Sequence, residues 1–146
     1  MIRAVIDTNV LVSGMLSGDG PPGAILGLTL RGLIMPVFNG QILAEYDRVL
    51  HRPRFGFAAS EIRSIIDTIE GIGLETQEGA WPEALPDRDD EKFLVAAAAG
   101  EAVLVTGNLR DFPAAARRHV AVLSPRQFLD SHADRILPFP EPPTRS

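Results

Sequence analysis

The segment Ile2-Arg3-Ala4-Val5-Ile6-Asp7-Thr8-Asn9 opens the chain with a short apolar run that stops abruptly at an acid, a hydroxyl and an amide. An apolar run of this length, bounded by polar residues, is typical of a strand buried on both faces of a parallel sheet. Asp7 would then lie at the carboxyl end of that strand, where open α/β sheets bind their ligands. A second interpretation stays open, because Asp7, Thr8 and Asn9 could simply cap the next helix.

Short apolar runs and helical segments alternate along the rest of the chain. Further strands are expected at residues 33–38, 74–77, 102–105 and 120–123. Helices are expected at residues 10–16, 22–32, 41–50, 87–100 and 124–129. Another is expected to begin at Ser60, as its cap, and to end near Gly71 or Gly73. The alternation predicts an α/β protein, a three-layer α/β/α sandwich around a central, mainly parallel sheet of about five strands. Pro36 suggests that its strand lies at a sheet edge or ends there.

Length and composition predict one domain with a substantial core. We assign residues 1–137 to this domain and residues 138–146, which are rich in proline, to an extended or disordered tail. The lack of cysteine excludes disulfides and thiolate metal sites, and it fits a cytoplasmic protein. No apolar run is long enough for a signal sequence or a membrane span. A net charge of −5 argues against a general nucleic-acid coating protein, but it is compatible with an acidic site neutralised by metal ions.

Glu45 has an unusual position on the predicted helix at residues 41–50. The apolar stripe of that helix consists of Ile42, Tyr46, Val49 and Leu50. Glu45 falls along this stripe rather than opposite it, and a carboxylate facing a core is costly unless it is paired or bound to a cation. The side chain is therefore either a cation ligand or a rim glutamate paired with Arg48 or Arg52.

The segment Asp87-Arg88-Asp89-Asp90-Glu91-Lys92-Phe93 opens an Ala-rich predicted helix with four carboxylates in five positions. Asp87 is expected to cap the helix, with Asp90 completing a pair that resembles a capping box. Capping and the helix dipole explain one or two of these acids. The excess like charge must be compensated elsewhere, which favours a bound cation.

Polar residues again follow an apolar strand at Thr106-Gly107-Asn108, and Asp111 comes one turn later. Asp7, Glu45, Asp90 and either Asn108 or Asp111 come from distant segments but could reach one edge of the sheet. Oxygen ligands without cysteine or paired histidine suit Mg²⁺ or Mn²⁺. Such ions bind phosphate oxygens and activate water for phosphodiester cleavage.

Four segments, at residues 5–13, 42–45, 87–94 and 103–108, resemble the motifs of PIN-domain proteins. The resemblance is to the branch that contains toxin components of toxin–antitoxin systems, related to the VapC ribonucleases, and it covers nearly the whole chain except the tail. It implies a metal-dependent endoribonuclease that uses one or two Mg²⁺ or Mn²⁺ ions. Asp7, Glu45 and Asp90 would be its catalytic and metal-binding acids. The partners that it implies are an RNA substrate, a cognate antitoxin protein and a second copy of the chain in a homodimer, with no membrane.

The fourth segment departs from the family pattern, which more often has Asp where this chain has Asn108. An amide oxygen can still bind a metal, but one compensating charge is lost, and Asp111 is a candidate replacement ligand. A catalytically weakened PIN scaffold that binds RNA or protein is therefore the alternative to an active enzyme. A phosphoacceptor domain of the receiver type is disfavoured, because it needs a lysine after the last strand and the single lysine here is Lys92.

Two further groups of residues are assigned to the predicted site. Residues expected to support the acids are Thr8, Asn9, Asp87 and Thr106. Arginines next to the acidic motifs could attract RNA around the rim of the site, or they could be ordinary solvated charges. These arginines are Arg52, Arg54, Arg88 and Arg110.

Overall fold

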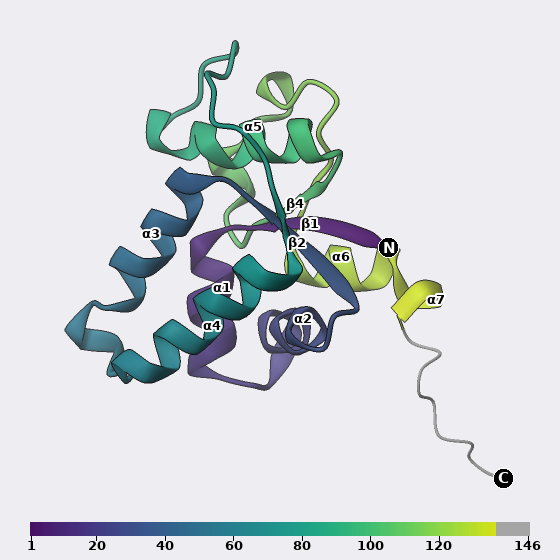
Figure 1. Ribbon diagram of the computed structural model, residues 1–146. Helices are drawn as coiled ribbons and strands as arrows, with labels where there is room; N and C mark the ends of the chain where they lie inside the picture. Colours follow the sequence, from purple (N-terminus) through teal and green to yellow (C-terminus); the bar gives the residue numbers. More distant parts are fainter. Residues whose placement is uncertain (137–146) are drawn as a thin grey trace, which may run out of the picture.

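The computed structural model describes residues 1–136, which form a sheet enclosed by helices on both faces (Figure 1). The strands are β1 (Ile2–Ile6), β2 (Ile34–Phe38), β3 (Leu74–Glu75), β4 (Val103–Val105) and β5 (Val122–Leu123). They form one five-stranded sheet in the order β3-β2-β1-β4-β5, and every neighbouring pair is parallel. The predicted three-layer α/β/α sandwich is confirmed.

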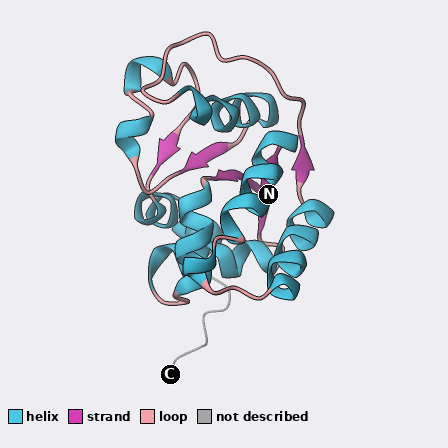
Figure 2. Ribbon diagram, turned by 90° about the vertical axis from the view of Figure 1, so that its left-hand side faces the viewer, coloured by secondary structure: helices cyan, strands magenta, loops and turns pink. Residues whose placement is uncertain are grey.

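Helices pack against both faces of this sheet, as Figure 2 also shows from the side. The α-helices are α1 (Thr8–Leu16), α2 (Gly20–Leu30), α3 (Gly40–Leu50), α4 (Ala59–Ile72), α5 (Glu91–Gly100), α6 (Pro125–Ser131) and α7 (Ala133–Ile136). Short 3₁₀ turns are η1 (Pro53–Phe55), η2 (Arg88–Asp90), η3 (Leu109–Asp111) and η4 (Ala114–Ala116). Helix α5 covers one face, and α2, α4 and α6 lie on the other (Figure 1).

The order of the strands reverses at the centre of the sheet. From β1 the chain moves outward to β2 and β3, and it then returns through α5 to β4 on the other side of β1. Ile6 and Val105 are paired at the carboxyl ends of β1 and β4, and the Asp7 amide donates to the Val105 carbonyl at 2.9 Å. Ligands of open α/β sheets bind at such a reversal point, so the topology directs attention to Asp7.

Strand β2 corrects one prediction about the sheet. It lies between β1 and β3, so the suggestion that Pro36 marks a sheet edge was wrong. Pro36 is paired with Ala4 of β1, and β3 is so short that its ladder begins only at Val37. The missing N–H of Pro36 is therefore tolerated inside the sheet, because β3 presents no ladder partner at that position. Strands β3 and β5 are each two residues long, shorter than predicted.

Two predicted helix starts are also corrected. Helix α4 begins at Ala59, after Ala58, and the Glu61 carboxylate accepts from the Ala58 amide at 3.4 Å, so Ser60 is not the cap. The chain tightens into the 3₁₀ turn η2 before α5, and the Asp87 carboxylate caps that turn by accepting from the Asp89 amide at 2.9 Å. Asp90 makes no capping hydrogen bond with its side chain, so the predicted capping box was wrong. Asp90 is thereby left for other interactions.

Between residues 1 and 136 no helix is long and apolar enough to cross a membrane. The extended tail predicted at residues 138–146 lies outside the described residues.

Gly73 allows β3 to approach β2, and this contact can be tested. A Cβ at Gly73 would collide with the Pro36 carbonyl oxygen and lie 2.7 Å from the Ile69 carbonyl oxygen, whereas a Cβ at Gly71 would meet open space. We expect Gly73→Ala to lower the free energy of unfolding by about 1–3 kcal/mol, because overpacking displaces the strand. Gly71→Ala, inside α4, should raise it by up to about 1 kcal/mol. Urea denaturation measures both, and equal effects of the two substitutions would contradict this explanation.

Candidate active site

Asp7 is a buried acid held at the reversal point of the sheet. Its side chain follows β1 directly, and the residue is 6% exposed. The buried Thr106, which follows β4, donates its hydroxyl to Asp7 Oδ2 at 2.7 Å. Burial raises the pKa of Asp7; the bond from Thr106 opposes this effect, and repulsion from Glu45 adds to it. Asp7 occupies the N-cap position of α1, but its side chain makes no capping hydrogen bond there. Its side chain instead accepts the hydrogen bond from Thr106, next to the neighbouring strand β4.

Glu45 reaches the same region from α3. The predicted apolar stripe of this helix is buried, and the Glu45 side chain is 12% exposed beside it. The hydroxyl of the buried Thr8 donates to Glu45 Oε2, and the Lys92 ammonium lies 2.7 Å from Glu45 Oε1. Arg48 is 3.8 Å from the same oxygen and largely exposed, so it is a weaker partner. The main partner of Glu45 is therefore Lys92, which the sequence did not indicate.

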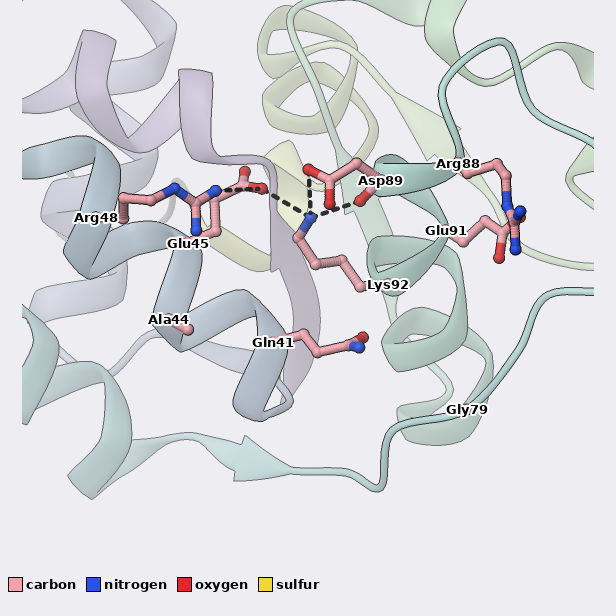
Figure 3. Close-up of a pocket in the computed structure, with 9 residues that line it drawn as sticks. All are labelled: Gln41, Ala44, Glu45, Arg48, Gly79, Arg88, Asp89, Glu91 and Lys92. Carbon is pink, nitrogen blue, oxygen red and sulfur yellow. Dashed lines mark hydrogen bonds and ion pairs between the residues drawn. The ribbon is translucent and has the colours of Figure 1, made fainter.

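Lys92 lies at the start of α5 and is only 7% exposed (Figure 3). Its ammonium donates to the Asp89 carbonyl and lies 3.1 Å from Asp89 Oδ2, in addition to the contact with Glu45. Burial alone would lower the pKa of Lys92, but hydrogen bonds to Glu45 and Asp89 outweigh this effect and raise it. A permanent positive charge is thus built into the acidic region. One feature of the sequence could have indicated that Lys92 is buried. It comes directly before Phe93 and Leu94, which are both buried.

Asp90 and Asp111 complete the group of acids around Asp7. Burial raises the pKa of Asp90 to about 7, and repulsion from Asp7, Asp111 and Asp87 adds to the shift. Asn108 donates its side-chain N–H to Asp111 Oδ2 at 2.9 Å. The amide at this position therefore orients a carboxylate one turn further along the chain.

These residues fit a hard divalent cation in charge and in donor chemistry. Within residues 1–136 no three carboxylate or histidine side chains are gathered tightly enough to enclose an ion. Mg²⁺ seldom needs such a cage, because it keeps several waters and takes one or two carboxylates together with substrate phosphates. Asp7 and Asp90 supply oxygens whose negative charge the protein leaves poorly compensated. A bound cation would remove that repulsion.

A cavity of about 320 Å³ opens between α3 and the start of α5, and its acidic lining consists of Glu45, Asp89 and Glu91 (Figure 3). Asp7, Asp90 and Asp111 are not among its lining residues. Gln41, Arg48, Arg88 and Lys92 are among its lining residues. Of the four arginines proposed from the sequence, Arg88 is the one in this cavity. Arg48, which the sequence suggested only as a partner of Glu45, lines it as well.

The other proposed arginines and supporting residues take varied positions. Arg52 and Arg54 lie in the exposed segment after α3, where the Arg54 guanidinium stands 5.1 Å from the centre of the Phe55 ring. Arg110 is exposed in η3, next to Asp111. Asn9 is exposed in the first turn of α1.

The sequence is similar to those of known proteins. A family model described as a PIN domain matches residues 3–110. Among curated proteins, the chain is similar to an uncharacterized protein of Methanocaldococcus jannaschii, with 27% identity over 140 residues that cover 88% of this chain and 90% of the relative.

Asp90 should make the stability of the metal-free protein depend on pH. Its pKa is raised to about 7 from an ordinary value of 3.8, so the folded state holds a proton that the unfolded state releases, and stability falls as pH rises between these values. We expect Asp90→Asn to raise the melting temperature at pH 8 by about 2–4 °C, the shift that about 1 kcal/mol produces in a domain of this size. Near pH 4 the gain should vanish.

Circular dichroism melts in the presence of a chelator measure this effect. Asp67→Asn, the same substitution at an exposed site on α4, is the matched control and should leave both melting temperatures unchanged. A lower melting temperature for Asp90→Asn at both pH values would contradict the assigned repulsion.

Proposed function

The chain belongs to the PIN domain family, whose members are generally metal-dependent nucleases, and from this membership we propose that it is a Mg²⁺- or Mn²⁺-dependent endoribonuclease that hydrolyses RNA phosphodiester bonds. The observation that carries the proposal is the buried Asp7 carboxylate at the reversal point of the sheet, surrounded by further acids. A buried carboxylate without a cationic partner lowers the stability of a protein, and such groups are found mainly at functional sites.

The residues of the site have two kinds of role in this proposal, metal binding and orientation of the metal ligands. Asp7 and Asp90 would hold the divalent ion beside Asp111, and the ion would supply charge neutralisation at the phosphate and an activated water. Thr106 fixes the Asp7 carboxylate and Asn108 fixes that of Asp111. These bonds restrict carboxylate rotation before any ion arrives, which lowers the cost of ordering the ligands.

The rim of the site supplies the attraction for RNA. A group of carboxylates repels phosphate, so substrate approach depends on cations beside it. Arg48 and Arg88 line the cavity next to Glu45 and are exposed to solvent. These two arginines would contact the phosphate backbone of the RNA on the α3 side of the acids.

We further propose that the protein is the toxin of a toxin–antitoxin pair and forms a homodimer, on the strength of the sequence resemblance. RNA cleavage inside the cell would then stop growth, and a cognate antitoxin protein would prevent it. A weakened PIN scaffold that binds RNA or protein is the second candidate, favoured by Asn108 at a position where the family more often has Asp.

Asp7→Asn tests the nuclease proposal directly. Loss of residues that only orient metal ligands costs 10–100-fold, so loss of a ligand should lower Mn²⁺-dependent cleavage of total RNA by at least about 100-fold. The fold should survive, because Asn keeps the size of the side chain and can still accept the Thr106 hydrogen bond. Asp19→Asn, in an exposed loop, is the control and should cleave like the parent.

The outcomes of this experiment separate the two candidate functions. Equal cleavage by Asp7→Asn and parent would remove Asp7 from the site. An inactive parent that still binds RNA would favour the scaffold. Expression in a bacterial host tests the toxin role, since only the parent and the Asp19→Asn control should halt growth.

The arginines can be compared in pairs by the salt dependence of RNA binding. Each lost phosphate contact should reduce the slope of log affinity against log salt by roughly 1. We expect the substitution of both Arg48 and Arg88 by Gln to reduce the slope, and that of Arg52 and Arg54 to have less effect, since these two lie outside the cavity. Fluorescence anisotropy with a labelled RNA in the Asp7→Asn background avoids cleavage. The opposite ranking would place the RNA along the segment after α3.

A further inference from the structure

The ion pair between Glu45 and Lys92 lies within the acidic site. We call this pair, together with its contacts to Thr8 and Asp89, the Glu45–Lys92 unit. Both oxygens of Glu45 have partners, since Oε2 accepts from Thr8 and Oε1 contacts the Lys92 ammonium at 2.7 Å. An ammonium has three donors, and Lys92 directs its own to three oxygens: Glu45 Oε1, Asp89 Oδ2 and the Asp89 carbonyl. Glu45 and Lys92 therefore each have a counter-charge at close range, as the dashed lines of Figure 3 mark.

The other three acids of the site lack such a partner. Asp7 accepts from the Thr106 hydroxyl and Asp111 accepts from the Asn108 amide, and both donors are neutral. Across residues 1–136, none of the ion pairs involves Asp7, Asp90 or Asp111. The negative charge available to a cation is therefore concentrated on these three residues, and that of Glu45 is already neutralised.

Moving Glu45 onto a metal ion would break this unit. Lys92 is 7% exposed and would lose its best-placed counter-charge, because Asp89 is 68% exposed and its ion pair is partly screened by water. An uncompensated buried charge is strongly destabilising.

We propose that Lys92 is a built-in cation that holds Glu45, so that the site takes up a single divalent ion at Asp7 and Asp90, with the charge of Asp111 nearby. Lys92 is a positioning residue in this scheme, because it acts through Glu45. The inference rests on the proposed function only in taking the acids to bind a divalent cation, and it makes no assumption about RNA.

Mn²⁺ binding to the full chain, without RNA, tests the proposal by calorimetry and by electron paramagnetic resonance of free Mn²⁺. The parent should bind one equivalent. Lys92→Met frees a carboxylate and should add a second equivalent, whereas Lys92→Arg keeps the charge and should still bind one. The double variant Glu45→Gln with Lys92→Met removes the pair without changing the net charge. It should bind one equivalent with a Kd within threefold of the parent.

Several results would overturn the proposal. They are two equivalents or none in the parent, a single equivalent in Lys92→Met, or a second equivalent in Lys92→Arg. A Kd more than threefold weaker in the double variant would make Glu45 a ligand and would also overturn it. If circular dichroism shows that Lys92→Met does not fold, the double variant decides, since it leaves no buried charge unpaired. A parent that binds one Mn²⁺ and cleaves no RNA would remove the proposed function and leave this inference standing.

Discussion

The hydrogen bond from Thr106 to Asp7 connects the fold to its chemistry. It joins the carboxyl ends of β1 and β4, the two strands between which the order of the sheet reverses. Parallel strands with helices on both faces leave a crevice there, and a short buried strand such as β1 delivers its next side chain into it. Asp7 is buried as a consequence, and this burial raises its pKa because the charged carboxylate is less well solvated. The remaining acids matter because they share this place.

The site balances charge in two different ways. On the α3 side, an internal ammonium compensates Glu45, and the pair needs nothing from solvent. Around Asp7, only neutral donors contact the carboxylates, and their mutual repulsion is retained in the folded protein. Such repulsion lowers stability and at the same time creates affinity for a cation, which is the usual compromise at a functional site. Because Glu45 has a cationic partner and the acids around Asp7 do not, the four acids need not all bind the same metal ion.

The sequence allowed the fold and part of the site to be predicted, for identifiable reasons. The run ending at Asp7 has the composition of a buried parallel strand, and the position of Glu45 on an apolar stripe follows from helix periodicity alone. Lys92 was missed because four neighbouring acids make a lysine look like a solvated partner, and its burial depends on the approach of α3, a tertiary contact. The capping interactions predicted for Asp87 and Asp90 were wrong because the sequence did not reveal a 3₁₀ turn, and this turn shifts the start of α5. The interior position of Pro36 depends on how short β3 is.

We propose that the uncompensated carboxylates around Asp7 form a divalent cation site. Anomalous diffraction from crystals soaked in Mn²⁺ tests it most directly, because the signal locates the ion without reference to activity. We expect one peak in contact with the carboxylate oxygens of Asp7 and Asp90, about 2 Å from them, with the Glu45–Lys92 pair intact. A soaked crystal with no peak at Asp7, or with a peak bound by Glu45 after Lys92 has moved away, would contradict it.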